Sequence, residues 1–104
     1  MIVGTCEIEI IIPAAYSLKE KRHVLKSILE RLKSRFNASV AEVDFNDIWN
    51  KAMIGVAVVG NKKSICEASI NSIIDFIDKD GRVEIINYSM EVLWQKRQMK
   101  YMNF

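Results

Sequence analysis

The chain has 104 residues, of which 50% are hydrophobic and 27% are charged, with four glycines and a single proline. This composition is typical of one compact soluble domain, and the length excludes both a disulfide-dependent miniprotein and a pair of ordinary domains. Fifteen lysines and arginines against thirteen acids leave a formal net charge of +2, which by itself indicates neither a nucleic-acid-binding nor a membrane protein.

The N-terminus and the cysteines predict the compartment. The opening MIVGTCEIEIIIP has no basic region before its apolar run, and Glu7 and Glu9 interrupt that run, which is not the pattern of a secretory signal. No stretch approaches the roughly 20 apolar residues of a membrane span. Cys6 and Cys66 belong to no CxxC motif and no Cys/His cluster, so we expect reduced, buried thiols in a cytoplasmic protein without metal or cofactor.

The first half of the chain predicts a strand and a helix. Period-2 alternation over residues 2–12 indicates a strand with one wholly apolar face, which Pro13 ends. Residues 17–20, SLKE, form a capping box that opens a helix, and Asn37 is its expected stop. The helix has one apolar stripe at helical spacing, made of Leu18, Leu25, Ile28, Leu29, Leu32 and Phe36.

The remaining elements are three strands and a second helix. The strands are expected over 39–43, 51–60 and 83–88, and the helix over 62–79. The strand over 51–60 is apolar on both faces and too short for a membrane, which indicates a central position in a sheet. Asn61 or Ser64 is the expected cap of the second helix.

The order strand, helix, strand, strand, helix, strand predicts the fold. Folded with right-handed crossovers, it gives a ferredoxin-like α+β sandwich, a four-stranded antiparallel sheet with both helices on one face and the first and third strands in the middle. We expect one such domain over residues 1–93, followed by a C-terminal tail over 94–104.

No helix is expected on the other face of the sheet. There the strand over 51–60 should present small apolar residues, with Met53, Ala57 and Val59 among them. Such a surface favours a partner, which could be a second subunit, the C-terminal tail or a ligand. These three residues are therefore the candidate interaction face of a homodimer or protein-interaction module.

The charge is unevenly placed along the chain. Residues 17–36 contain seven lysines and arginines and two glutamates, a net charge of +5, so the rest of the chain carries −3. At 100° per residue, four of these cations fall on one flank of the first helix, beside the buried stripe. In order around the helix they are Arg22, Lys33, Lys26 and Lys19.

Three cations stand in the first turn of this helix, where the macrodipole disfavours positive charge by about 0.3 to 1 kcal/mol each. Together with the free backbone N–H groups they are typical of an anion or phosphate site. The predicted site consists of Ser17, Lys19, Lys21 and Arg22, extended by Lys26 and Lys33. The alternative is a solvated helix face that is merely rich in lysine and arginine.

The other candidate residues are more typical of surface positions than of metal binding or catalysis. Glu42, Asp44 and Asp47 could meet a divalent cation, but acids at the end of an edge strand more often keep that edge soluble. His23 projects away from the apolar stripe, which indicates a surface residue and not a general base. Glu7 and Glu9 are expected as solvated acids on the open face of the sheet, and no catalytic residue is predicted.

The open face also argues against one mode of RNA binding. RNA-recognition domains stack bases on aromatic residues of their two central strands, and both central strands here lack Phe, Tyr and Trp. If the protein binds RNA, we expect it to use the first helix. The segment from Met90 onward suits single-stranded nucleic acid, but the aggregation liability of its large apolar residues slightly favours packing onto the sheet or a neighbouring subunit. Its basic residues are Lys96, Arg97 and Lys100, and its aromatic or apolar residues are Trp94, Met99, Tyr101, Met102 and Phe104.

The opening strand and the following YSLKEKRHVLKSILERLKSRFNASVAEVDFNDIWNKAMIGVAVVGN resemble the small bacterial YlxP-like family, a domain of unknown function. The resemblance covers about residues 1–93, and its motifs are SLKEKR, FNASVAEVD and the segment around Trp49. It implies a ferredoxin-like sandwich. Because genes of the family commonly stand beside those for translation initiation and ribosome maturation, it also implies a role with RNA or the ribosome, and it supplies no catalytic residues.

Three hypotheses follow. The first is a non-enzymatic module that binds RNA or a ribosomal particle through the basic first helix. The second is a homodimer or protein-interaction module that uses the open sheet face. The third, a small phosphate-ester or acyl-phosphate hydrolase, rests only on analogy with other proteins of this fold.

Overall fold

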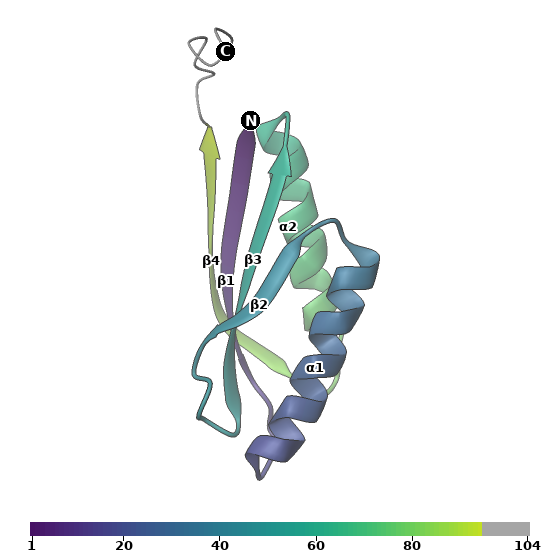
Figure 1. The fold of residues 1–104 in the computed structure, drawn as a ribbon, viewed down its shortest axis with the longest axis vertical. Helices are drawn as coiled ribbons and strands as arrows, with labels where there is room; N and C mark the ends of the chain where they lie inside the picture. The colour runs from purple at the N-terminus through teal and green to yellow at the C-terminus, as the bar shows by residue number, and fades with distance from the viewer. Residues whose placement is uncertain (95–104) are drawn as a thin grey trace, which may run out of the picture.

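The computed structural model describes residues 1–94, which form four strands and two helices (Figure 1). They are β1 (Ile2–Ile11), α1 (Leu18–Arg35), β2 (Ser39–Asp44), β3 (Lys51–Gly60), α2 (Lys63–Asp78) and β4 (Glu84–Trp94). The strands form one antiparallel sheet in the order β2-β3-β1-β4, and the helices lie on one of its faces. The predicted ferredoxin-like α+β arrangement, with the first and third strands in the middle, is confirmed.

The core lies between the sheet and the helices. The period-2 pattern of β1 places Ile8 and Ile10 on the helix-covered face, where both are fully buried. They belong to one cluster with Ile54 of β3, Ile28 of α1 and Ile70 of α2. Each of these side chains contributes about 1.5 to 3 kcal/mol by leaving water, so this layer is the main stabilising element of the fold.

The N-terminus of α1 has the predicted capping box. The backbone N–H of Glu20 donates to Oγ of Ser17 at 3.1 Å, and Oε2 of Glu20 accepts from the backbone N–H of Tyr16 at 2.7 Å. At the other end, Phe36 adopts extended backbone angles while its N–H still donates to the carbonyl of Leu32. The helix therefore ends at Arg35 with Phe36 as its C-cap, directly before the predicted stop at Asn37.

The second helix begins differently from the prediction. Its N-cap is Lys62, whose side chain makes no capping hydrogen bond, so the proposed cap at Asn61 or Ser64 was wrong. Ser64 already lies inside the first turn. Strand β1 approaches α2 closely at Gly4: an added Cβ would lie 2.9 Å from Cδ1 of Ile70 and 3.2 Å from Cβ of Cys66, so a larger residue there would force a neighbouring side chain to shift.

The last strand is longer than the predicted range 83–88. It runs to Trp94 because β1 is paired along its whole length, from Ile11 opposite Glu84 to Ile2 opposite Trp94, with one irregularity between Glu9 and Ile10. Residues 89–94 thus complete the ladder of a central strand. The predicted roles of the segment 95–104 lie outside the described residues.

Candidate nucleic-acid interface

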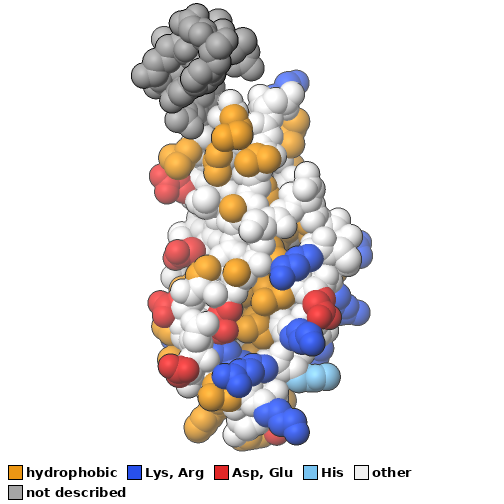
Figure 2. Space-filling model, viewed as in Figure 1, with side chains coloured by type: hydrophobic (Ala, Val, Ile, Leu, Met, Phe, Trp, Pro, Cys, Tyr) orange, Lys and Arg blue, Asp and Glu red, His pale blue; other side chains and the backbone are white. Residues whose placement is uncertain are grey.

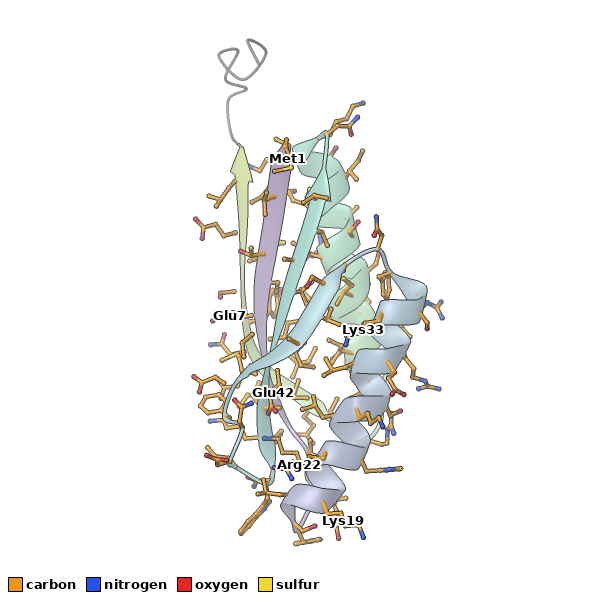
Figure 3. All side chains as sticks on the ribbon, in the orientation of Figure 1. Met1, Glu7, Lys19, Arg22, Lys33 and Glu42 are labelled. Atoms are coloured by element: carbon orange, nitrogen blue, oxygen red, sulfur yellow. The ribbon has the colours of Figure 1, made fainter. Side chains whose placement is uncertain are left out.

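Four predicted site residues, Lys19, Arg22, Lys26 and Lys33, are exposed on α1, and we call them the basic ridge. Figure 3 labels Lys19, Arg22 and Lys33 along this helix. Lys26 is 78% exposed, and its ammonium group lies 4.0 Å from the carboxylate of Glu30. Within residues 1–94 the other three members of the ridge form no ion pair within 4.0 Å. The ridge therefore presents charge that the described part of the protein does not neutralise.

Three members of the ridge share a groove. Arg22, Lys26 and Lys33 line a depression that also touches β2. Its other lining residues are Leu25, Leu29, Glu30 and Glu42. Figure 2 shows hydrophobic side chains between the basic side chains of α1 and the sheet. The groove thus combines cations with apolar side chains.

The fourth member of the ridge lies on a different hollow. Lys19 lines a mainly apolar depression near the start of α1, together with His23 and Arg82. His23 is exposed there, as predicted. The predicted phosphate site is consequently divided, because Lys19 does not line the groove that Arg22 and Lys33 line.

The structure corrects the predicted role of Lys21. Only 1% of this residue is exposed, and its Nζ atom has three oxygen neighbours. It donates to the carbonyls of Phe45 at 2.6 Å and Ile48 at 2.7 Å, and it lies 2.8 Å from Oε2 of Glu42. Two of the three N–H donors of the ammonium group are thus hydrogen-bonded, and its charge is paired with Glu42. Lys21 is not available to a phosphate.

The contact between Lys21 and Glu42 is an ion pair more than a directed hydrogen bond. Oε2 of Glu42 is buried and receives no well-aligned hydrogen bond from residues 1–94, while the positive charge of Lys21 lies 2.8 Å away. Coulombic attraction is strong at this distance in a low-dielectric interior. The carboxylate that sequence reasoning considered for a metal is thus engaged by an internal cation.

A signal for the buried lysine was present in the sequence. Lys21 precedes Leu25, Ile28 and Leu32 by four, seven and eleven residues, so it falls in the middle of the buried stripe and not on the ridge. The charge of Lys21 alone had indicated a phosphate ligand. Its position in the first turns is explained by its internal oxygen partners, without an external anion.

The cap of α1 is also engaged. Oγ of Ser17 accepts the hydrogen bond from Glu20, so this hydroxyl is committed to the helix. The carboxylate of Glu20 adds negative charge beside the helix N-terminus. The N-terminal half of the predicted site is therefore not assembled as expected, whereas the exposed cations along the helix remain candidates.

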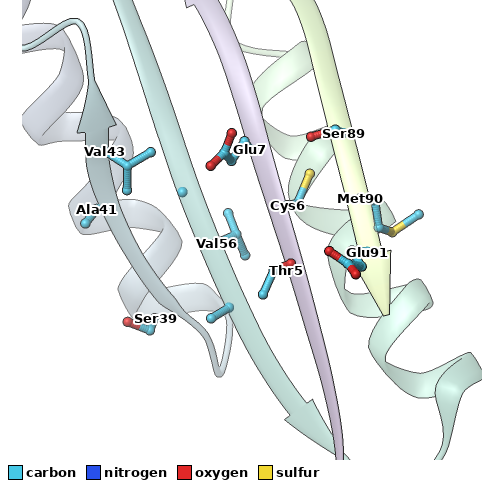
Figure 4. A pocket seen from close by; sticks show the side chains of 12 residues that line it. Thr5, Cys6, Glu7, Ser39, Ala41, Val43, Val56, Ser89, Met90 and Glu91 are labelled. Atoms are coloured by element: carbon cyan, nitrogen blue, oxygen red, sulfur yellow. The ribbon is translucent and has the colours of Figure 1, made fainter. Parts of the chain in front are cut away.

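The open sheet face carries acids as well as the expected apolar residues. Met53 is partly buried, and Ala57 and Val59 are exposed. In the sheet, Glu7 of β1 lies between Gly55 of β3 and Ser89 of β4. Thr5 of β1 likewise lies between Ala57 of β3 and Glu91 of β4. Figure 4 shows the two glutamates on the side of the sheet away from the helices, where they line a shallow hollow.

The thiols, Glu9 and the other potential metal ligands of the described residues form no reactive site. Burial, with a smaller contribution from Glu7, raises the pKa of the Cys6 thiol to about 11, and both Cys6 and Cys66 are free and buried as predicted. Glu9 is not a solvated acid, because its carboxylate lies 2.7 Å from Nζ of Lys51. In residues 1–94 no three His, Cys, Asp or Glu side chains gather as a metal site would need.

Neither described helix is long and apolar enough to cross a membrane. The fold and the surface define a small ferredoxin-like α+β protein with a basic helix and an acidic sheet face. Residues 3–90 match the family described as "Protein of unknown function (DUF503)". The chain is also similar to "Uncharacterized protein YlxP" of Bacillus subtilis (strain 168), with 39% identity over 82 residues, which cover 79% of this chain and 89% of that protein. The chain therefore belongs to the DUF503 family, and the YlxP-like resemblance is confirmed.

Proposed function

We propose that this protein binds RNA by its phosphate backbone, free or in a ribosomal particle, through the basic ridge of α1. The observation that carries the proposal is the groove that Arg22, Lys26 and Lys33 line together. Of these three cations, Lys26 alone has a carboxylate within 4.0 Å among the described residues, that of Glu30. Phosphates that bind there release counterions, and this release is the main source of sequence-independent affinity for nucleic acid.

The dimensions of the ridge suit a polynucleotide. At 1.5 Å per residue, Arg22 and Lys33 are about 16 Å apart along the helix axis. A stacked strand advances about 3.4 Å per nucleotide, so the part of the ridge from Arg22 to Lys33 would follow about five steps. A single small anion would engage only one end of this surface.

The acidic sheet face supports the choice of the helix as the binding surface. Glu7 and Glu91 on the open face would repel phosphates, whereas seven cations and two glutamates lie within residues 17–36. After Lys21 is subtracted as an internal charge, the exposed surface of that segment still carries six cations. Figure 2 shows this separation, with basic side chains over α1 and acidic ones mainly over the sheet.

The test is an anisotropy titration of a labelled RNA oligonucleotide with the full chain. Arg22→Gln combined with Lys33→Gln removes two ridge charges with little change in helix propensity. The matched control, Lys62→Gln combined with Lys63→Gln, removes the same charge from the start of α2. We expect the ridge variant to bind at least about 10-fold more weakly and the control within about 2-fold of the original chain. Equal losses in both variants would contradict the proposal.

The open face supports self-association as a second candidate function. Val59 of β3 is 62% exposed. It pairs with Val3 of β1, which pairs with Leu93 of β4, and β2 does not extend to this row. An apolar row of this kind favours a second copy of the chain. Sedimentation velocity of the chain and of Val59→Asp tests it: a dimer that the substitution dissociates is the expected result, and a monomer at high micromolar concentration contradicts it. The hydrolase hypothesis gains no supporting observation.

A further inference from the structure

We infer that the loop over residues 45–50 presents Trp49 as a platform on which a base of single-stranded RNA stacks, beside the basic ridge. The inference rests on the proposed function and adds the class of RNA. It starts from a half-exposed indole at a place where the backbone is held by hydrogen bonds.

The backbone on both sides of Trp49 is anchored. The carbonyl of Phe45 accepts hydrogen bonds from the N–H of Ile48 at 3.0 Å and from Nζ of Lys21 at 2.6 Å. The carbonyl of Ile48 also accepts from Lys21, and the carbonyl of Asn50 accepts from the N–H of Ile12 at 2.9 Å. Trp49 therefore projects from a segment whose neighbours are hydrogen-bonded to α1 and to the end of β1.

The loop conformation is unusual. Phe45 has a φ angle of 63°, which lies in the left-handed region that residues with a Cβ rarely adopt. Its ring lies 4.7 Å from Nζ of Lys51, so it packs against a cation and not in the core. Such a conformation persists only where the surrounding contacts hold it, and here Lys21 supplies two of those contacts.

The indole itself remains in solvent. Trp49 is 52% exposed, and it belongs neither to the hydrophobic core nor to the partly buried residues packed against it. A large aromatic ring left in solvent on a rigid loop is a surface that another flat ring can cover. The other half of its surface contacts the protein, so the stability of each Trp49 variant is measured alongside its affinity.

The loop that carries Trp49 is tied to the start of α1, the helix of the ridge. Lys21 bonds the carbonyl of Ile48, the residue before Trp49, while Arg22, the residue after Lys21, begins the groove. Figure 2 shows basic and hydrophobic side chains close together at the lower end of the molecule, where the β2–β3 connection meets the start of α1. A strand whose phosphates follow the ridge could therefore place a base over the indole.

This arrangement selects for single strands. Bases of a duplex are already stacked on each other and paired, whereas unpaired bases are free to stack on aromatic side chains. Cations alone would bind both forms. The combination of ridge and indole therefore favours single-stranded RNA over a duplex of the same length.

The experiment compares Trp49→Ala, Trp49→Phe and the control Tyr88→Ala, which removes an aromatic side chain of similar exposure, 50%, from β4 at the far edge of the sheet. Each is titrated with a labelled 12-nucleotide single strand and with a 12-base-pair RNA duplex. We expect Trp49→Ala to weaken binding of the single strand about 5- to 100-fold, Trp49→Phe to restore most of it, and duplex binding and the Tyr88 variant to stay unchanged.

A spectroscopic readout separates stacking from a structural effect. In a Trp94→Phe background Trp49 is the remaining indole of the chain, and the single strand should quench its fluorescence. Unchanged urea midpoints would show that the variants are folded. Two results would overturn the platform and leave the proposed function standing. In the first, the ridge variant loses binding while Trp49→Ala does not. In the second, Trp49→Ala weakens binding of the single strand and of the duplex equally. If the original chain binds neither RNA, both fall.

Discussion

The ammonium group of Lys21 lies 2.8 Å from the carboxylate of Glu42, joining the start of α1 to β2 inside the protein. The same ammonium group binds two carbonyls of the β2–β3 connection. One lysine therefore holds a helix, an edge strand and a loop in register. Lys21 is therefore the one cation of the seven in residues 17–36 that is buried.

We expect a strong energetic coupling between these two residues. Lys21→Met leaves the Glu42 carboxylate and two carbonyls without their cation, and it should lower the free energy of unfolding by about 3 kcal/mol. Glu42→Gln should cost less, and the double substitution should cost at least about 1 kcal/mol less than the sum. Urea unfolding measures all three. Strict additivity would contradict the ion pair.

Lys26→Met is the matched control for that cycle, because it removes an exposed lysine from the same helix. Its contact with Glu30 is long and solvated, so the free energy of unfolding should change by less than about 0.5 kcal/mol. A loss as large as that of Lys21→Met would show that charge on α1, and not the internal contact, is responsible.

The pair Asp80 and Arg82 predicts a dependence of stability on pH. Hydrogen bonds from Arg82 hold the pKa of Asp80 below its ordinary value of 3.8. Because the folded pKa is the lower one, the stabilisation is complete above the unfolded value and is lost as the pH falls through the folded value. Asp80→Asn should therefore lower the free energy of unfolding by about 1 kcal/mol at neutral pH. The difference in the free energy of unfolding between the original chain and Asp80→Asn should shrink below about pH 4. A difference that stays constant down to about pH 2 would contradict this prediction.

The buried cysteines predict slow thiol chemistry. With its pKa near 11, Cys6 carries almost no thiolate at pH 8, and Cys66 is fully buried. A thiol reagent should therefore modify both more than about 100-fold faster in denaturant than in buffer. A fast reaction of either residue in the folded protein would show that the core opens locally.

Gly4 predicts a packing defect. Gly4→Ala places a methyl group 2.9 Å from Ile70 and 3.1 Å from Val58, so we expect a loss of about 1 to 3 kcal/mol in the free energy of unfolding. Gly81→Ala is the control, since nothing lies within 4 Å of its Cβ, and it should be neutral or slightly stabilising. Equal effects would refute the close approach of β1 and α2.

Most of the fold could be predicted from hydrophobic periodicity, because the buried face of β1 and the stripe of α1 repeat at the spacing of their backbones. The capping box at Ser17 was equally readable. The end of β4 was not, since its extension to Trp94 depends on pairing with β1, a tertiary contact that the local pattern of residues 89–94 does not specify.

The candidate site was predicted in part. The exposed cations Arg22, Lys26 and Lys33 could be placed on one flank from helix geometry alone. The role of Lys21 was missed because it depends on carbonyls of Phe45 and Ile48, more than 20 residues away in the chain. Tertiary contacts of this kind leave no local pattern except the position of a lysine within an apolar stripe.

The salt dependence of RNA affinity tests the central claim most directly. If four phosphates of a single strand contact the ridge, the logarithm of the association constant should fall with the logarithm of salt concentration at a slope of about −3. The slope should be about −1.4 for Arg22→Gln with Lys33→Gln and unchanged for Lys62→Gln with Lys63→Gln. A slope that is the same for the chain and its ridge variant, or no salt-dependent binding at all, would contradict the account.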